Sequence, residues 1–123
     1  RSNHANNVRN DRACLLDILD AIAGIEKYGS SRASFDADER TQAWMVSRLQ
    51  IIGEACRHLS SEFRERHAEI PWRLIIGMRH HLVHGYFDID PDVVWAAITE
   101  RIPELKGDVE HAMATDAAVF EIE

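Results

Sequence analysis

Apolar residues recur every three or four positions along most of the chain, which is the spacing of one face of an α-helix. Such stripes cover residues 15–28, 44–59, 72–83 and 94–102, and a weaker one covers 105–113. No stretch alternates apolar and polar residues in the manner of a half-buried strand. The pattern therefore predicts an all-α fold, an antiparallel helical bundle of four to five helices with short connections.

Helix-start signals mark three positions between these stripes. Asp36 precedes Glu39 by three residues, which is the arrangement of a capping box. Pro71 is predicted to occupy the first turn of the third helix, where its missing N–H costs no hydrogen bond. Asp90 followed by Pro91 repeats the start signal for the fourth helix. These signals divide the chain where the apolar stripes do.

Glycine and proline mark helix ends in the second half of the chain. The third helix is expected to run to about Val83 and to end at Gly85, and Pro103 is expected to break or kink the fourth. A length of 123 residues fits one domain, so the whole chain is predicted to form a single helical domain. Within it we expect residues 1–8 to be flexible and residues 114–123 to form a tail.

Charge is distributed unevenly along the chain. There are 14 Lys and Arg residues against 21 Asp and Glu, and the net charge of −7 does not suggest a nucleic-acid partner, since phosphate binding usually leaves a basic surface. Residues 57–84, however, carry five arginines, three glutamates and five of the seven histidines. This segment is the only positive part of the sequence, and it permits a local anion site on an acidic body.

The sequence does not suggest a membrane or secreted protein. No apolar run approaches the roughly 18 residues of a membrane span, and the polar start RSNHANNVRND lacks the features of a signal peptide. Cys14 and Cys56 both lie in apolar stretches, which favours free thiols over a disulfide. We expect a cytoplasmic protein without a membrane partner.

The stretch GMRHHLVHGYFDID, residues 77–90, combines an arginine with three histidines. An imidazole titrates near neutral pH and can move the proton of a ribose hydroxyl, while a guanidinium holds phosphate oxygens. These residue types suit RNA cleavage without a metal. On an unbroken helix Arg79 and His84 would point about 140° apart. They can cooperate only if the helix ends near His84 or if two chains share the site across a two-fold axis.

Two other interpretations of the cluster stay open from the residues alone. His80 and His84 are one helical turn apart, a spacing that can chelate zinc, although no glutamate accompanies them as in a protease motif. The histidines can equally belong to a solvated helix end. Tyr86 offers a comparable choice, because a tyrosine just past a helix end often buries its ring and hydrogen-bonds locally.

The segment Arg79–Tyr86 reads R-x4-H-x-Y and resembles the signature of HEPN-domain toxins of the HepT type. The likeness extends to LLDILDAI at 15–22, RLQIIGEACRHLS at 48–60, IPWRLIIGMRHHLVHGYFDID at 70–90 and VVWAAITERIPELK at 93–106, in the family's order. The blocks are spread over residues 15–106.

The resemblance implies a HEPN-like homodimer with a ribonuclease site in a cleft at the two-fold axis. Arg79 and His84 match the two catalytic positions of the motif, and neither a metal nor another cofactor is expected. The implied substrate is RNA, with tRNA the leading candidate. The implied partner is a minimal nucleotidyltransferase antitoxin of the MntA type, which transfers AMP from ATP onto the motif tyrosine, here Tyr86, and silences the toxin. A non-catalytic HEPN-like module that binds a nucleotide or the partner is the alternative.

Four further side chains are expected to assist this site. Family members commonly carry asparagine after the arginine, where this chain has His80, which leaves open which histidine moves the proton; His84 is preferred. Glu54 is an acid on a largely apolar stretch, expected to support the site, which is preferred, or to pair with an arginine, for which Arg48, Arg57 and Arg73 are available. Arg57 and Arg73 are candidate contacts to the RNA backbone, although solvated helix faces explain them as well.

Overall fold

The computed structural model describes residues 2–29 and 31–117. In chain order the elements are α1 (Ser2–Tyr28), α2 (Arg32–Ala37), α3 (Glu39–His58), α4 (Ser61–Arg66), α5 (Trp72–Gly77), η1 (Met78–His81), β1 (Val83–His84), β2 (Asp88–Ile89), α6 (Pro91–Ala96), η2 (Ala97–Arg101) and α7 (Ile102–Thr115). The backbone of η1 is a 3₁₀-helix and that of η2 a π-helix. The predicted all-α fold is confirmed, with one short hairpin added.

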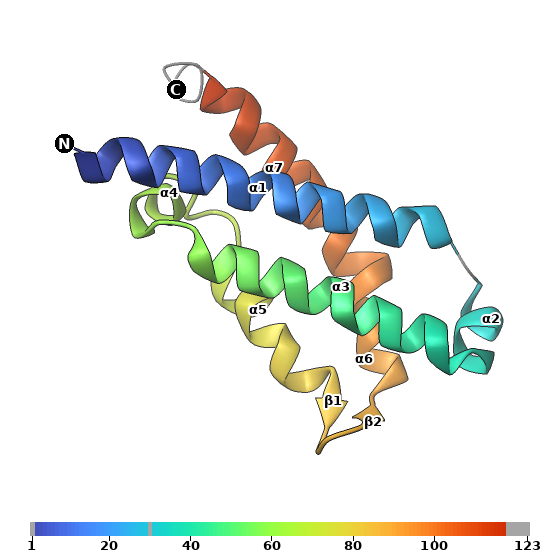
Figure 1. Ribbon diagram of the computed structural model, residues 1–123. Helices are drawn as coiled ribbons and strands as arrows, with labels where there is room; N and C mark the ends of the chain where they lie inside the picture. The colour runs from blue at the N-terminus through green and yellow to red at the C-terminus, as the bar shows by residue number, and fades with distance from the viewer. Residues whose placement is uncertain (1, 30, 118–123) are drawn as a thin grey trace.

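Two long antiparallel helices form the framework of the molecule (Figure 1). Helix α1 lies along α3, α5 packs against α3, and α7 returns along α1 toward the end where α1 begins. The β1–β2 hairpin projects from the opposite edge of the bundle (Figure 1). The chain therefore presents the histidine-rich segment at an edge of the bundle and not in its interior.

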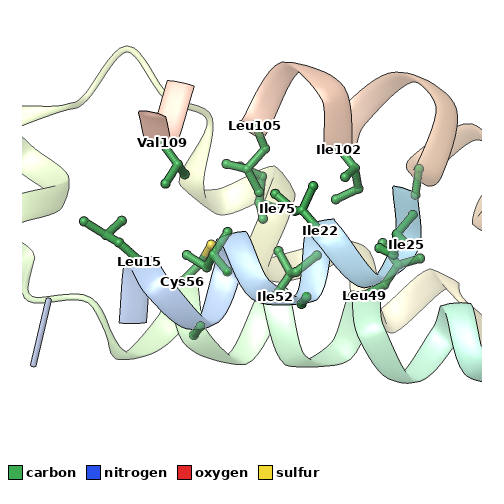
Figure 2. Packing of buried hydrophobic residues seen from close by; sticks show 14 of the residues in the cluster. Leu15, Ile22, Ile25, Leu49, Ile52, Cys56, Ile75, Ile102, Leu105 and Val109 are labelled. Carbon is green, nitrogen blue, oxygen red and sulfur yellow. The ribbon is translucent and has the colours of Figure 1, made fainter. Parts of the chain in front are cut away.

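The interior forms where the apolar stripes of α1, α3, α5 and α7 meet (Figure 2). The side chains buried there include Leu15, Ile22, Ile25, Leu49, Ile52, Cys56, Ile75, Ile102, Leu105 and Val109. Both cysteines are free thiols, as predicted, and burial raises the pKa of Cys56 to about 12. Truncating one buried Leu or Ile to Ala in such a core usually costs about 2–5 kcal/mol.

The predicted capping box between the first two stripes was wrong. A short helix, α2, precedes α3, so Asp36 lies inside a helix and pairs with Arg32 at 2.9 Å. Asp38, whose backbone is extended, is the N-cap of α3 and accepts hydrogen bonds from two amides of its first turn. Glu39 is therefore the first residue of α3. The N-cap of α3 lies two residues after the predicted one because a short extra helix, capped by Ser31, forms ahead of it.

The two later start signals lie at true helix starts. Asp90 is the N-cap of α6, as predicted, and accepts a hydrogen bond of 3.2 Å from the amide of Val93, with Pro91 in the first turn. Pro71 is the N-cap residue of α5 and not a residue of its first turn, because the helix begins one residue later, at Trp72.

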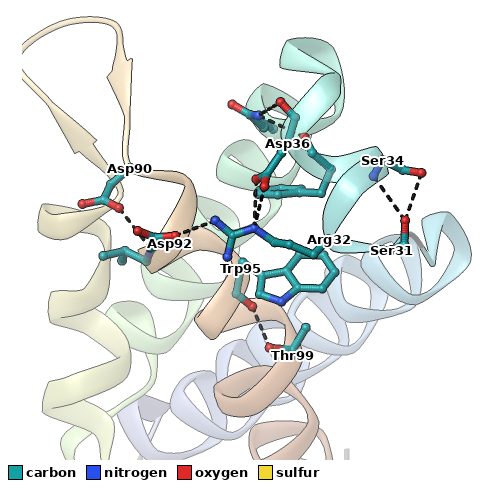
Figure 3. A network of polar contacts seen from close by, with 11 residues as sticks. Ser31, Arg32, Ser34, Asp36, Asp90, Asp92, Trp95 and Thr99 are labelled. Carbon is teal, nitrogen blue, oxygen red and sulfur yellow. Dashed lines mark hydrogen bonds and ion pairs between the residues drawn. The ribbon is translucent and has the colours of Figure 1, made fainter.

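Arg32 ties α2 to α6 (Figure 3). Its Nε donates to Asp36, and its Nη2 lies 2.5 Å from a carboxylate oxygen of Asp92. The guanidinium carbon also lies 5.9 Å from the centroid of the Trp95 ring. Because α6 begins directly after β2, these contacts anchor one end of the hairpin.

The third helix ends earlier than predicted. Helix α5 stops at Gly77, and the chain continues through η1 into the hairpin, so Val83 is in a strand. Leu82 is fully buried, and its carbonyl accepts a hydrogen bond of 2.8 Å from the amide of Asp90, which closes the hairpin. Gly85 has a φ of 69° and reverses the chain. A two-residue strand is too short to show alternation in the sequence.

A π-helical segment precedes Pro103. The amide of Ile102 donates to the carbonyl of Ala97, five residues back, and α7 follows η2 directly. Proline lacks an N–H and its ring clashes with the carbonyl four residues back, so a wider turn accommodates it. The helix thus changes to a widened turn at the place where a break or kink was predicted, and it continues as α7.

Helices reach close to both ends of the described chain. Helix α1 begins at Ser2, so most of the segment 1–8, which we expected to be flexible, is helical. Helix α7 extends through Thr115, and residues 118–123 of the tail expected at 114–123 lie outside the described residues. Within the described ranges, no helix combines the length and apolar character that a membrane crossing requires.

Candidate active site

Arg79 contacts Glu54 where η1 passes α3. Its Nη1 donates a hydrogen bond of 2.7 Å to Oε1 of Glu54. Both α5 and η1 lie close to α3 at Gly53, where a Cβ atom would be 3.6 Å from the carbonyl oxygen of Ile75 on α5 and 4.0 Å from Cδ of Arg79 on η1. Of the two expectations for Glu54, pairing with an arginine is thus observed.

Glu54 brings together three nitrogen-bearing side chains. Besides Arg79, it accepts a hydrogen bond of 2.7 Å from Nη2 of Arg57, and Nε2 of His58 lies 2.9 Å from its Oε2. The hydrogen bond from Arg57, helped by those from His58 and Arg79, outweighs desolvation and lowers the pKa of Glu54 from 4.5 to about 2. The carboxylate is therefore ionised at physiological pH and only accepts hydrogen bonds. Arg57, predicted to contact RNA, is held in this cluster.

An open cavity of about 830 Å³ lies beside the cluster, between α1, α3 and η1. Its lining residues are Cys14, Asp17, Ser47, Gln50, Ile51, Glu54, Ala55, His58, Arg79 and His80. The side chain of Arg79 is 32% exposed, so a ligand in the cavity can reach it. The cavity combines a guanidinium, carboxylates and two imidazoles, which are the residue types that bind phosphate and move protons.

His84 lies on the hairpin, opposite Asp88 in the β1–β2 pair. Its exposed ring places Nε2 2.9 Å from Oδ2 of Asp90, and this contact is the main cause that lowers the pKa of Asp90. Among the described residues of one chain, Arg79 therefore pairs with Glu54 and His84 with Asp90. The structure does not bring the two predicted catalytic residues into contact within one protomer.

The geometry assumed for a zinc site is not present. His80 belongs to η1 and His84 to β1, so the two residues do not share a helix face. In the part of the chain that the structure describes, no three His, Cys, Asp or Glu side chains are grouped as metal ligands. His80 instead lines the cavity with Arg79.

Tyr86 and Phe87 occupy the tip of the hairpin, and each is 93% exposed. Their ring centroids lie 6.3 Å apart. The interpretation in which Tyr86 buries its ring was therefore wrong, because the turn at Gly85 places both aromatic residues outside the bundle. The Tyr86 hydroxyl is accessible to another protein.

Two residues outside the segment 77–90, Arg73 and His58, also bear on the site. Arg73 is exposed on α5, and nothing in the structure tests its predicted RNA contact. His58 was not singled out from the sequence, although its place one helical turn after Glu54 was a visible signal for a pair. The denser histidine cluster at residues 77–90 is the stronger signal in the sequence.

Comparisons with known proteins show the family of the chain. The profile of the family described as "Ribonuclease HepT-like" matches residues 18–112, which include the Glu54 cluster and the hairpin. The chain belongs to this family.

Three relatives illustrate the match. A protein of Thermococcus cleftensis named "Probable ribonuclease HepT" is 39% identical over 104 residues, which are 83% of this chain and 94% of the relative. A protein of Caldanaerobacter subterraneus subsp. tengcongensis whose name designates an RNase is 40% identical over 85 residues, 69% of this chain and 76% of the relative. One of Methanocaldococcus jannaschii, also designated an RNase, is 32% identical over 104 residues, 83% of this chain and 95% of the relative. No solved structure matches the chain.

Membership of the ribonuclease HepT-like family confirms the family and the enzyme class predicted from the sequence. The matched range contains the whole R-x4-H-x-Y segment, residues 79–86. The roles of the individual residues in that segment remain predictions, as do the dimer and the antitoxin.

Proposed function

We propose that this ribonuclease is a metal-independent endoribonuclease toxin of a toxin–antitoxin module, in which Arg79 and His84 act on RNA at the cleft of a homodimer. The observation that carries the proposal is the position of Arg79, held by Glu54 at the wall of an open cavity. A guanidinium fixed in this way binds phosphate oxygens and stabilises the charge that develops on them.

The reaction requires a proton to leave the ribose 2′-hydroxyl while the phosphate is attacked. His84 takes that proton, the 2′-oxygen bonds to phosphorus, and the bond from phosphorus to the 5′-oxygen breaks. Asp90, 2.9 Å from Nε2 of His84, orients the imidazole. The products are a 2′,3′-cyclic phosphate and a 5′-hydroxyl.

A homodimer explains why Arg79 and His84 are separate in one chain. Two copies related by a two-fold axis place the arginine of each copy near the histidine of the other. Leu16 and Ile51 support such an interface, because they remain 42% and 39% exposed on α1 and α3, and Ile51 lines the cavity. Exposed apolar residues beside a functional cavity are typical of a surface that a partner covers.

Cleavage of RNA in EDTA tests the activity. Purified protein is expected to cut RNA with the chelator present and to leave 2′,3′-cyclic phosphate ends, and Arg79→Ala and His84→Ala are expected to lose the activity. His111→Ala, an exposed histidine on α7, is the matched control. Cleavage that EDTA abolishes, or that His84→Ala leaves unchanged, contradicts the assigned mechanism.

Mixed dimers test the shared site. Arg79→Ala and His84→Ala are each inactive, but a dimer of one of each retains one intact site if the residues come from different chains. Statistical mixing therefore restores about a quarter of the wild-type activity. A site built within one protomer gives no restoration.

We further infer that the antitoxin is a minimal nucleotidyltransferase that attaches AMP to Tyr86, that the substrate is tRNA, and that both proteins act in the cytoplasm. The exposed Tyr86 hydroxyl supports the modification, since a second enzyme can reach it. AMP adds bulk and negative charge near the hairpin and competes with substrate phosphate. Mass spectrometry after co-expression with the neighbouring gene should find AMP on Tyr86. Tyr28→Phe should keep this modification and Tyr86→Phe should lose it.

A further inference from the structure

His58 and Glu54 form a carboxylate–imidazole pair in the same cavity as Arg79. The two residues are one turn apart on α3, and Nε2 of His58 lies 2.9 Å from Oε2 of Glu54. The other oxygen of Glu54, Oε1, accepts the hydrogen bond from Arg79. One carboxylate therefore positions both the phosphate-binding guanidinium and an imidazole that is 59% exposed.

The carboxylate determines which ring nitrogen of His58 exchanges a proton. Glu54 has a pKa of about 2, so it is ionised at neutral pH and cannot donate a hydrogen bond. The contact of 2.9 Å with this carboxylate requires a hydrogen on Nε2 of His58 in both charge states of the ring, and Nη2 of Arg57, 3.4 Å from Nε2, is then a neighbour and not a donor to it. Nδ1 is left as the atom that gains and loses a proton, as in other imidazoles oriented by a carboxylate.

Cleavage of RNA needs two proton transfers, one from the 2′-hydroxyl and one to the departing 5′-oxygen. The proposed function gives the first to His84 and leaves the second without a residue. Two histidines line the cavity, but among the described residues only His58 of that pair contacts a carboxylate. His67 also pairs with an acid, Asp116, but its side chain is buried and so cannot meet RNA.

We propose that His58 is the second proton-transfer residue of this ribonuclease, and that its Nδ1–H protonates the 5′-oxygen as the bond from phosphorus breaks. The proposal rests on the proposed function, because it requires the scissile phosphate to bind Arg79. The proton given up by Nδ1 is regained from water before the next turnover. Glu54 is the positioning residue that holds His58 and Arg79 on the same side of the cavity.

Other titratable or charged groups lie close to His58, and their effects must be distinguished from its own. Cys14 and Asp17 on α1, Glu54 on α3, and Arg79 and His80 on η1 line the cavity, and Arg57 on α3 contacts Glu54. Desolvation and the nearby Asp11 and Asp17 raise the pKa of Cys14, which keeps the thiol neutral at neutral pH. His80→Ala is therefore measured beside His58→Ala, because His80 is the other imidazole that lines the cavity.

Two substrates with different leaving groups test the proposal. One is an RNA dinucleotide, and the other is a ribonucleoside 3′-(4-nitrophenyl phosphate), whose leaving group departs without needing a proton. His58→Ala is expected to lower kcat about 10²–10⁴-fold on the dinucleotide and to cleave the nitrophenyl ester near the wild-type rate. The fall of kcat at alkaline pH, caused by deprotonation of the acid, should disappear in this variant.

His58→Gln is the second variant, because its amide can still donate to Glu54 but cannot transfer a proton. It should behave as His58→Ala does, and His111→Ala should behave as the wild type. An equal loss on both substrates, or no loss on the dinucleotide, overturns the proposal. If His58→Gln keeps the wild-type kcat on the dinucleotide, the role of His58 is purely structural, and this result also overturns the proposal.

Failure of this inference is distinguishable from failure of the proposed function. If the wild type cleaves the dinucleotide, Arg79→Ala does not, and His58→Ala equals the wild type, then only the role of His58 is wrong. If the wild type cleaves neither substrate, the ribonuclease mechanism at Arg79 is wrong and the role of His58 is rejected with it.

Discussion

The guanidinium of Arg79 and the carboxylate of Glu54 lie 2.7 Å apart, although 25 residues separate them in the chain. The contact joins the first residue of the R-x4-H segment to α3, outside that segment. Glu54 also accepts a hydrogen bond from Arg57 and contacts His58, so one carboxylate holds these three nitrogen-bearing side chains in position.

Removal of this carboxylate should weaken catalysis more than it weakens the fold. Glu54→Ala releases Arg79 from its position, and a displacement of about 1 Å at a reacting group can cost about 10²-fold in rate. We expect kcat for RNA cleavage to fall by about that factor while the melting temperature changes little, because the side chain is partly exposed. Glu65→Ala, an exposed acid on α4, is the control. An unchanged kcat would show that Glu54 does not position Arg79.

Asp90 has two tasks that one pair of variants separates. It caps α6 through the amide of Val93 and holds His84 at 2.9 Å. Asparagine caps a helix about as well as aspartate does, whereas alanine does not. Asp90→Asn should therefore keep the melting temperature and lower the rate of RNA cleavage, and Asp90→Ala should lower both. Equal rates of RNA cleavage for Asp90→Asn and the wild type would show that His84 does not need the carboxylate of Asp90.

A buried acid joins α1 to α4. Asp11 accepts hydrogen bonds of 2.7 Å from the amide and from the hydroxyl of Ser60, the N-cap of α4. Asp11→Ala leaves the Ser60 amide without this partner, which should cost about 1–3 kcal/mol of unfolding free energy. Urea denaturation measures the change, and exposed Arg12→Ala should stay within about 0.5 kcal/mol of the wild type. If Asp11→Ala unfolds at the same urea concentration as the wild type, the contact between Asp11 and Ser60 does not stabilise the fold.

The end of α7 is held by a contact that depends on pH. Burial alone would raise the pKa of Asp116, but hydrogen bonds from Arg66 and His67 outweigh it and lower that pKa below 3.8. A depressed pKa in the folded state contributes stability above pH 3.8, and this contribution is lost as the pH falls through the lowered value. Asp116→Asn should therefore melt below the wild type at pH 7, and the two melting temperatures should converge in acid. If the difference between the two melting temperatures stays constant as the pH falls, the effect comes from packing and not from the charge of Asp116.

The helices could be predicted because each buries one face in the same core, and burial of one face imposes a repeat of about 3.6 residues that a linear chain displays. Leu15, Ile52, Ile75 and Leu105 are buried members of four separate stripes. The cap at Asp90 was equally visible, since a side-chain oxygen three residues before its amide donor is a local arrangement.

Two features that depend on the surrounding fold left no such trace in the sequence. The N-cap of α3 is Asp38 and not Asp36 because α2 forms ahead of it, and both acids look alike as caps in the sequence. The hairpin depends on the burial of Leu82 and on its hydrogen bond to Asp90, eight residues later.

Local periodicity and a contiguous motif made the helical fold, the family and the residue types gathered at 77–90 predictable from the amino-acid sequence alone. In the folded chain Arg79 and His58 both contact Glu54 on one wall of a cavity, while His84 turns to Asp90 on a hairpin, and these contacts are visible only in three dimensions. The contact between Arg79 and Glu54 comes from packing of α3 against α5 and η1, and packing brings together side chains whose separation along the chain carries no signal.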